Sequence, residues 1–442
     1  MNIRFHYKCL VIIFLSSISV NVLAQKKSSC KAQKLNKHDS CLVSSAQKIE
    51  VLDDQILTNS SSAVQTCMLN SVLPHDVYET CGTATKPHEI EVRVLLDECK
   101  TTSCWMLHSE SGFLLLDPLN PKKSISVQTK HISVSSKSGY VYIDGRRLTR
   151  NRVIVRAQEG NILFNDHEYG GSFYVVCISD KIFLINCIDL EDYVASVLDS
   201  ESWPGWPHEM HKVMAIAIRS YGVAMMMQAM SNKRIYHVKN SVKHQVYGGF
   251  HKKRALYDAV AETSGIIMTY NKKPVLAMYD SCCGGVVTAR MKGIDFVKAP
   301  YLARKTPCTF CKSCKIFSWT AEFDKSELTS LLKSDIPKLS KIKTVTVSKK
   351  DAAGLVQQVS VKSAHGISTV SGKKIFSLKP KIKSYYYSIE NTPNKIIFKG
   401  RGYGHHVGLC QWGASRMIEE GYDYKKTLRF YYPGISFVKL VK

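Results

Sequence analysis

The sequence is short of acidic residues. It holds 36 Asp and Glu against 61 Lys and Arg, so the formal net charge is +25 over 442 residues. Such an excess predicts an acidic partner, which would be a nucleic acid, an anionic membrane surface or a polyanionic polymer. A diffuse basic surface without a dedicated partner is the alternative, and charge alone does not decide between them.

Beyond the leader, the sequence also lacks any run that approaches about 18 consecutive apolar residues, so we expect no transmembrane segment. The leader itself has basic residues at Arg4 and Lys8, an apolar stretch over 10–22, and Ala24 before Gln25. This pattern predicts a signal peptide over residues 1–24 and an exported protein of the periplasm or cell envelope. Export argues against nucleic acid as the natural partner.

Two common catalytic signatures are missing. The glycine-rich run Gly400–Ala414 lacks the Lys-Ser/Thr ending of a phosphate loop. Ser281 lacks the glycine spacing of a nucleophile elbow, and no serine triad emerges. The chain also shows no internal repeat.

The run Gly400–Ala414 is nevertheless the most unusual stretch, because its five glycines stand beside two adjacent histidines, a glutamine and a tryptophan, which are His405, His406, Gln411 and Trp412. Glycines permit positive φ and close backbone approach, so the run predicts a loop at a site, whose backbone comes close to a partner that the run does not identify. The histidines suit ligand or proton-transfer roles, or a plain hydrogen bond to the backbone. Gln411 and Trp412 suit sugar recognition, although Trp412 could equally fill the core.

Cysteine is abundant. Of 15 cysteines, Cys9 lies in the leader, and the fourteen that remain favour disulfides in an oxidising compartment. Cys308, Cys311 and Cys314, with Cys282 and Cys283 upstream, also have zinc-like spacing. Because the chain is predicted to be exported, we expect disulfides there and no cofactor, with zinc as the open alternative.

The chain divides at about residue 88. Residues 25–87 are polar, carry four cysteines and predict a flexible or disulfide-stapled extension. From Ile90 onward, apolar and polar residues alternate, which predicts a β-rich platform. Its expected strands cover residues 90–96, 125–134, 139–143, 152–157, 172–178 and 181–188.

Helical periodicity begins after Asp189. Apolar residues at 190, 193, 194, 197 and 198 form one stripe, and Glu201 continues it up to the helix-breaking segment 202–207, which contains two tryptophans. A second helix over 208–230 is apolar on most sides and contains Arg219, whose buried charge needs a carboxylate or a polar substrate. The pattern indicates an α+β fold with a central helical pair.

Later segments are less periodic. We expect a helix over 252–264, strands over 266–270 and 275–279, a hairpin of 341–348 with 355–362, and a helix over 414–420.

Glu201 is the candidate for chemistry. A carboxyl group in an apolar, aromatic pocket has a raised pKa and can donate a proton to a glycosidic oxygen. An ordinary helix-end glutamate, exposed or paired with Arg219, is the alternative. Asp192 and Asp199 are poorly placed to be a second catalytic carboxylate, and a mechanism with one carboxylate would require a nucleophile that belongs to the substrate itself.

Taken together, these segments resemble the SpoIID/LytB family over residues 89 to 438. The resemblance rests on ordered blocks at 88–96, 192–201 followed by Trp206-Pro207, 215–221, 245–249, Ser281 with Gly284-Gly285, and 400–414. His406 stands where the family usually has glycine, and Cys410 where it usually has serine. Some relatives carry zinc just before the Gln-x-Tyr block, but here only His237 and His244 lie nearby, so we expect no metal there.

The resemblance implies a SpoIID-like catalytic region over 88–442, with a Lys-rich β subdomain at about 320–398 and a substrate cleft between subdomains. The implied activity is a peptidoglycan lytic transglycosylase that cuts peptide-free glycan strands to 1,6-anhydro products, for cell-wall remodelling in division or sporulation. Glu201 would act first as acid and then as base. The implied substrate-binding residues are Arg219, Gln245, Tyr247, Ser281, His405, Gln411 and Trp412.

The implied partners are glycan strands and an N-acetylmuramoyl-L-alanine amidase. The alternative is a protein without catalytic activity, which enhances such an amidase or binds glycan in the wall.

Overall fold

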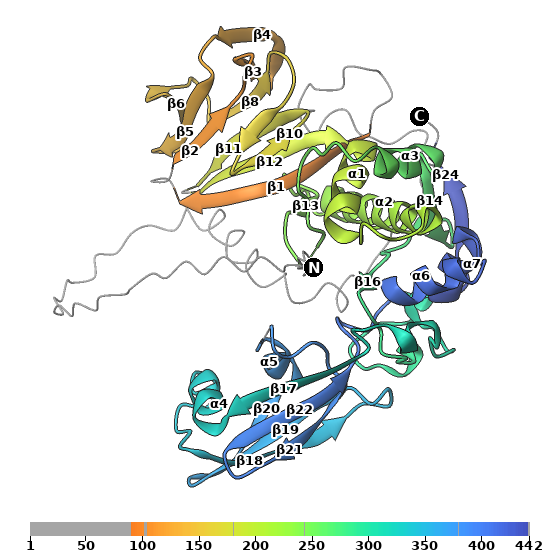
Figure 1. Ribbon diagram of the computed structural model, residues 1–442. Helices are drawn as coiled ribbons and strands as arrows, with labels where there is room; N and C mark the ends of the chain where they lie inside the picture. The colour runs from red at the N-terminus through yellow and green to blue at the C-terminus, as the bar shows by residue number, and fades with distance from the viewer. Residues whose placement is uncertain (1–89, 101–103, 180, 243, 379, 441–442) are drawn as a thin grey trace, which may run out of the picture. The chain divides into compact units, whose positions relative to one another are not determined.

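The computed structural model of the chain describes residues 90–440, apart from 101–103, 180, 243 and 379 (Figure 1). The predicted signal peptide and the extension over 25–87 lie outside the described residues. Within the described part, the fold is α+β, as predicted, with several sheets and seven α-helices.

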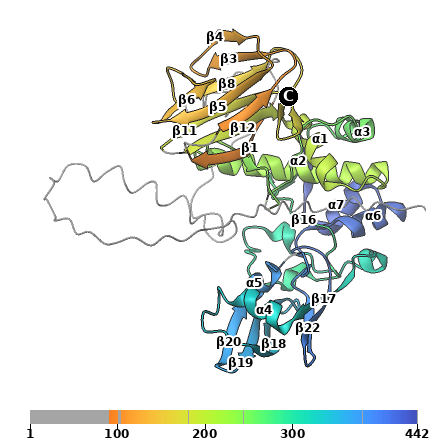
Figure 2. The same cartoon turned by 60° about the vertical axis from the view of Figure 1, so that its left-hand side comes forward.

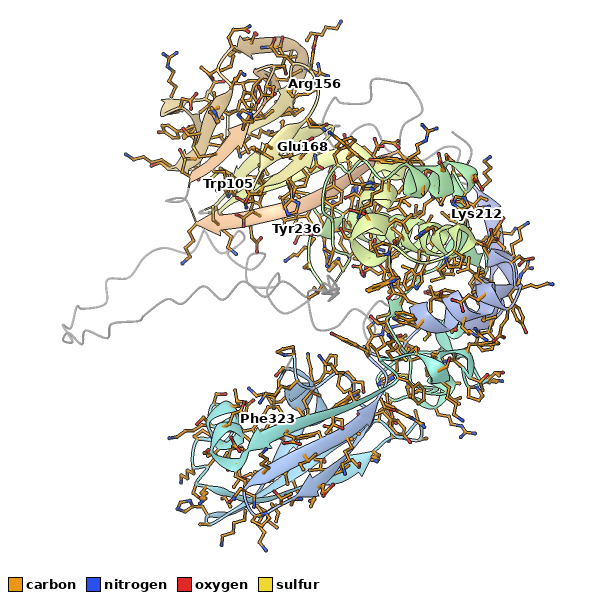
Figure 3. All side chains as sticks on the ribbon, viewed as in Figure 1. Trp105, Arg156, Glu168, Lys212, Tyr236 and Phe323 are labelled. Atoms are coloured by element: carbon orange, nitrogen blue, oxygen red, sulfur yellow. The ribbon has the colours of Figure 1, made fainter. Side chains whose placement is uncertain are left out.

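Two mainly antiparallel sheets form the β-rich platform. The seven-stranded sheet has the order β13 (Val238–Lys239), β1 (Glu91–Lys100), β12 (Lys181–Asp189), β11 (Ser172–Ile178), β8 (Arg152–Ala157), β3 (Phe113–Asp117) and β4 (Asn120–Val127). The six-stranded sheet has the order β10 (His167–Tyr169), β9 (Ile162–Phe164), β2 (Cys104–His108), β5 (His131–Lys137), β6 (Tyr140–Ile143) and β7 (Arg146–Arg147). Both sheets contribute side chains to one apolar core, including Trp105 of β2 (Figure 3).

The strand predicted over 125–134 is wrong in one respect, because the structure divides it between β4 and β5. The polar residues 128–130 form the turn between them. The expected strands over 152–157 and 172–178 coincide with β8 and β11, and the one over 181–188 lies within β12.

The predicted helical pair is α1 (Leu190–Glu201) and α2 (His208–Ser231). Asp189, the last residue of β12, caps α1 by accepting the Glu191 N–H at 2.8 Å. Every residue of the predicted apolar stripe is buried. Helix α2 is long and apolar enough to cross a membrane by length and composition, but 78% of its most apolar window is buried, as in the core helix of a folded domain.

Arg219 lies on α2 with no exposed surface, and Glu191 of α1 is its partner. Its Nη2 lies 2.6 Å from a Glu191 carboxylate oxygen, and its Nε also donates to that carboxylate. The remaining donors reach the backbone carbonyls of Val260 and Ile266. The sequence left a carboxylate and a polar substrate open as partners of Arg219, and the structure shows a carboxylate. This ion pair connects α1 with α2.

The next segment begins with α3 (Arg254–Glu262), β14 (Ile266–Tyr270), β15 (Lys273–Pro274) and β16 (Tyr279–Asp280), followed by the 3-10 turns η2 (Thr288–Arg290), η3 (Pro300–Leu302) and η4 (Phe310–Ser313). The strand predicted over 275–279 is largely wrong. One reason is that the Leu276 N–H donates to the Tyr301 hydroxyl at 3.0 Å instead of to a neighbouring strand.

The chain ends with β23 (Leu409–Cys410), α6 (Gln411–Glu419), α7 (Tyr424–Tyr431) and β24 (Ser436–Lys439). Strand β24 pairs with β14, and both α6 and α7 contact α2 (Figure 2). Helix α6 begins three residues before the start predicted from sequence.

The Lys-rich segment builds two three-stranded sheets. One has the order β17 (Ser318–Asp324), β22 (Lys395–Arg401) and β21 (Tyr387–Asn391), and the other has the order β18 (Ile342–Lys350), β19 (Val356–Ser363) and β20 (Gly366–Ser371). Helix α4 (Lys325–Leu332) contacts β17 and β18, and helix α5 (Gly372–Phe376) contacts β19 and β20. The sheets share an apolar core of their own, which includes Phe323 (Figure 3). The ring centroids of Phe323 and Phe398 lie 5.6 Å apart in an edge-to-face arrangement. The predicted hairpin is confirmed as β18 and β19.

We predict that Arg219→Ala lowers the free energy of unfolding by about 3–5 kcal/mol, because it leaves the Glu191 carboxylate without its buried partner. Denaturant titration measures this change. The control is Arg254→Ala, because Arg254 is exposed and pairs with Asp258 within α3; it should cost less than about 1 kcal/mol. If Arg219→Ala unfolded like wild type but lost glycan binding, Arg219 would be a substrate residue after all.

Candidate active site

The Glu201 carboxyl group stands at the last residue of α1 and is half-buried. Its Oε1 accepts the backbone N–H of Val246 at 3.0 Å. Burial raises the pKa of Glu201 above its ordinary value, and the Val246 hydrogen bond opposes only part of that shift. No second carboxylate among the described residues contributes to the shift. The direction is the one that the sequence predicted, and pairing with Arg219 is excluded because Arg219 bonds Glu191.

Gln411 is the first residue of α6, and it is buried against the end of α1. Its Nε2 donates to the backbone carbonyl of Glu201 at 3.0 Å. The amide therefore fixes the main chain that carries the Glu201 side chain, and it does not bond the carboxyl group itself. Gln411 is a positioning residue in this arrangement.

Trp412 lies beside the two tryptophans of the segment that ends α1. Its ring centroid lies 6.2 Å from that of Trp203 and 6.2 Å from that of Trp206. The backbone N–H of Trp412 donates to the backbone carbonyl of Ser281 at 3.1 Å. Trp412 is half-buried, so it keeps some exposed surface. Ser281 takes part in the site region through its main chain.

Gln245 connects two tyrosines close to Glu201. The Tyr193 hydroxyl donates to Gln245 Oε1 at 2.6 Å, and Gln245 Nε2 donates to the Tyr279 hydroxyl at 3.2 Å. Because Tyr279 accepts this bond, its own proton is left for another acceptor. Burial, and then the charge of Glu201, raise the pKa of Tyr279. Sequence reasoning missed Tyr279, although it directly precedes the block that contains Ser281.

Two predicted substrate residues lie in the core instead. Tyr247 is buried, stacks on Tyr193 at 5.7 Å and donates its hydroxyl to Asn186 Oδ1 at 2.5 Å. Arg219 is fully buried against Glu191. Neither side chain can contact a substrate in this structure, so both support the framework behind the site.

The glycine-rich run approaches the chain's own backbone. Gly408 has φ 76°, and a Cβ there would lie 1.9 Å from the Met278 carbonyl oxygen. Gly404 has φ 133°, and a Cβ there would lie 2.4 Å from the Asp280 Cβ. Strand β23 pairs in parallel with β16, with Leu409 opposite Tyr279. The close approach predicted from these glycines is therefore to the chain itself at Gly404 and Gly408.

His406 is a structural residue with φ 68°, a conformation that glycine adopts more easily. Its Nδ1–H donates to the Cys283 carbonyl at 2.9 Å, and its Nε2 accepts the Tyr385 N–H at 3.3 Å. Burial lowers the pKa of His406 to about 4, so the ring is neutral. This is the backbone-bonded alternative that the sequence left open.

His405 is partly exposed, and its Nδ1 accepts the Val407 N–H at 3.1 Å. Its predicted contact with a sugar stays a prediction. Upstream of Gln245, His237 accepts the Arg93 N–H through Nδ1 at 3.1 Å, and burial lowers the pKa of His237 to about 3.

The substrate cleft also stays a prediction. An open hollow of about 360 Å³ lies elsewhere, lined by Thr309, Phe310, Lys312, Ser313, Arg416 and Glu420.

The expectation of disulfides is wrong for the described cysteines of residues 282–314 and for Cys410, because none of them forms a disulfide in the structure. Several of them gather beside the glycine-rich run.

The segment that contains Glu201 matches a known protein family. Residues 179–270, which include Glu201 and Gln245, match the SpoIID family of stage II sporulation proteins. An uncharacterised protein of Brachyspira hyodysenteriae is 31% identical over 288 residues, which cover 65% of this chain and 76% of the relative. The chain belongs to the SpoIID family.

Two more relatives of this SpoIID-family chain carry functional names. Stage II sporulation protein D of Bacillus subtilis is 27% identical over 56% of the chain and 74% of the relative. The amidase enhancer of Bacillus subtilis is 26% identical over 54% of the chain, but the match spans only 39% of that relative. Residues 308–408 match a domain of unknown function, DUF8618.

We predict that Glu201→Gln stabilises the fold at alkaline pH. The pKa of Glu201 is higher in the folded state, so ionisation costs folding free energy as pH rises from the ordinary value of 4.5 through the folded pKa. Glutamine avoids this cost and still offers an oxygen to Val246. Denaturant titrations across pH should show the gain at high pH and none below pH 4.5.

The control for this titration is Glu262→Gln. Lys212 and His208 lower the pKa of this exposed carboxyl, so its replacement should give a small change of the opposite sign. If Glu201→Gln were less stable than wild type at alkaline pH, the fold would stabilise the ionised form of Glu201, and the raised pKa would be contradicted.

Proposed function

We propose that this protein is a peptidoglycan lytic transglycosylase, with Glu201 as its single catalytic acid and base. The observation that carries the proposal is the raised pKa of a half-buried carboxyl group whose main chain is held by Gln411. A carboxyl group whose pKa is raised by burial holds its proton to higher pH and can donate it to a leaving-group oxygen. Membership of the SpoIID family and the named relatives support a role in the cell wall.

The proposed reaction has two proton transfers. Glu201 first donates its proton to the oxygen between N-acetylmuramic acid and N-acetylglucosamine, and the bond from C1 to that oxygen breaks. The C6 hydroxyl of the same muramic acid then bonds to C1, and its proton passes to the Glu201 carboxylate. The product is a 1,6-anhydro sugar, water is not consumed, and Glu201 returns to its protonated form.

A single carboxylate suffices for this reaction because the nucleophile is part of the substrate. Retaining and inverting glycosidases use two carboxylates, and a second one would also perturb the pKa of the first. Within the described part of the chain, only burial and the Val246 hydrogen bond shift the pKa of Glu201. The site therefore suits internal attack better than hydrolysis.

The neighbouring groups suit a sugar. The half-buried Trp412 offers an aromatic face, and Tyr279 has a hydroxyl proton left over from its bond with Gln245. We propose that these two residues contact the glycan and that Gln245 orients Tyr279. The net charge of +25 suits a denuded strand, because muramic acid without its peptide keeps a free lactyl carboxylate. Such a substrate requires an exported protein that acts in the envelope.

A second function, enhancement of an N-acetylmuramoyl-L-alanine amidase without cleavage, is favoured by one observation. The matched amidase enhancer shares 26% identity over 290 residues. This alternative predicts that wild type and Glu201→Gln bind glycan and stimulate an amidase equally, and that neither releases anhydro sugars.

We predict that Glu201→Gln lowers the release of anhydro sugars from denuded glycan by about 100-fold or more, the usual contribution of a general acid. Mass spectrometry of the soluble products measures it. The matched control is Asp199→Asn on the same helix, since Asp199 pairs with Lys253 at the surface. It should retain cleavage. Equal release by Glu201→Gln and wild type would contradict the proposed role.

Gln411→Ala should lower the turnover rate more than it raises KM, because the lost amide holds Glu201 in place and is not assigned to substrate. Losing one buried hydrogen bond should also cost about 1–3 kcal/mol of stability. Gln358→Ala, at an exposed position of β19, is the control and should change neither quantity. A Gln411→Ala variant with unchanged turnover but weaker glycan binding would make Gln411 a substrate ligand.

A further inference from the structure

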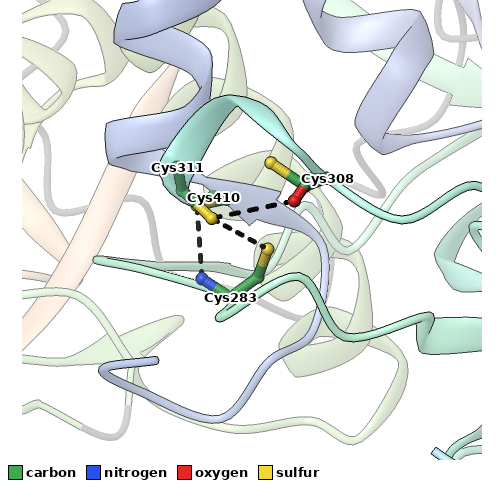
Figure 4. A group of neighbouring side chains, drawn as sticks. All are labelled: Cys283, Cys308, Cys311 and Cys410. Atoms are coloured by element: carbon green, nitrogen blue, oxygen red, sulfur yellow. Dashed lines mark hydrogen bonds between the residues drawn. The ribbon is translucent and has the colours of Figure 1, made fainter. Parts of the chain in front are cut away.

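We propose that Cys283, Cys308, Cys311 and Cys410 bind one zinc ion in a structural site. The proposal does not rest on the transglycosylase activity. The four residues come from three segments: the loop after β16, the turn that contains η4, and the end of β23. Figure 4 shows the four neighbouring side chains, and all four are buried.

The geometry matches one tetrahedral metal ion. The four Sγ atoms all lie within 4.8 Å of one another, and Cys283 Sγ lies 3.9 Å from Cys311 Sγ. Zinc holds thiolates at about 2.3 Å, which places two sulfurs of a tetrahedron about 3.8 Å apart. A disulfide would join two of the sulfurs at about 2 Å. The spacing therefore fits four thiolates around a shared ion.

Arg304 gives an independent indication of negative charge at this place. Its side chain is buried, and its Nη2 lies 3.8 Å from Cys283 Sγ. Its other hydrogen bonds reach the carbonyls of Val286 and Thr306, and its guanidinium lies 5.5 and 5.7 Å from the ring centroids of Phe430 and Tyr431. Among the described residues it makes no ion pair with a carboxylate. A buried cation needs a compensating anion. Zinc with four thiolates carries a net charge of −2, which would compensate the guanidinium.

Hydrogen-bond donors point at the sulfurs, as expected around a metal–thiolate centre. Cys410 Sγ accepts the N–H of Cys283 at 3.2 Å and the N–H of Gly413 at 3.4 Å. The Tyr431 hydroxyl lies 3.2 Å from Cys308 Sγ. At Gly413, a Cβ would lie 2.7 Å from Cys308 Sγ, so the cluster leaves room only for glycine at this position.

The site would be closed. Four protein ligands complete the coordination of zinc, and catalytic zinc sites keep a position for water or substrate. The centre therefore has no room for a zinc hydrolase mechanism. Its role would be to anchor Cys410, and Gln411 follows directly and bonds the Glu201 carbonyl. Zinc at this point would fix the start of α6 beside the candidate catalytic residue.

The direct test is metal analysis of the full exported chain purified without added metal. We expect one zinc per chain by elemental analysis, and a zinc absorption-edge spectrum with four sulfur neighbours at about 2.3 Å. Cys308→Ser and Cys410→Ser should lose zinc. Cys104→Ser, which changes an exposed cysteine of β2, should keep the wild-type zinc content.

The wild-type spectrum and a thiol count keep the proposal testable if the serine variants do not fold. A chain without zinc whose four cysteines are joined as disulfides by peptide mass spectrometry would overturn it. Iron in place of zinc, or a zinc shell rich in nitrogen or oxygen, would also overturn it. These outcomes are separable from the fate of the proposed activity, because none of them measures glycan cleavage.

The anchoring role has its own readout. Removing zinc with a chelator should increase amide hydrogen exchange in residues 308–314 and 400–414, while β1 and β12 stay protected. Unchanged exchange in both segments after zinc removal would contradict anchoring.

Discussion

The parallel pairing of β16 with β23 is the contact on which the candidate site depends. It brings Tyr279 next to Leu409 and Asp280 next to Cys410, although some 130 residues separate the strands in sequence. The approach is possible because Gly404 and Gly408 have no Cβ to collide with residues 278–280. The His406 N–H then donates to the Asp280 carboxylate at 2.6 Å, which completes the connection between the two segments.

Three consequences follow from this one contact. Gln411 directly follows β23, and its side-chain amide donates to the backbone carbonyl of Glu201. Tyr279 is a residue of β16, and the charge of the same Glu201 carboxyl group helps to raise its pKa. Cys410 joins three other thiols in the buried cluster. A loop rich in glycine is intrinsically mobile, because glycine loses much conformational entropy on ordering. Pairing on one side and a metal cross-link on the other would remove that freedom and make the position of Gln411 reproducible.

The sequence predicted the parts that depend on local periodicity. Helices α1 and α2, the strands β8, β11 and β12, and the partly buried Glu201 follow from spacing along the chain, but β2 and β3 were not predicted. Partners distant in sequence could not be predicted.

Arg219 needed a carboxylate, but several acidic residues qualified, and only the fold shows that Glu191 is the partner of Arg219. The glycines indicated a close approach without naming the partner, which proved to be the chain itself. Cysteine spacing likewise left disulfides and zinc open, because Cys410 lies about a hundred residues from Cys308 and had no visible link to it.

The central claim is that a lone, protonated Glu201 cleaves glycan by internal attack of the sugar's own hydroxyl group. The most direct measurement is digestion of denuded glycan in water enriched in heavy oxygen, followed by mass spectrometry of the new muramic acid ends. The account predicts 1,6-anhydro ends that contain no oxygen from water, and their loss in Glu201→Gln. Reducing ends that carry heavy oxygen at C1 would show hydrolysis by an activated water and would contradict the account.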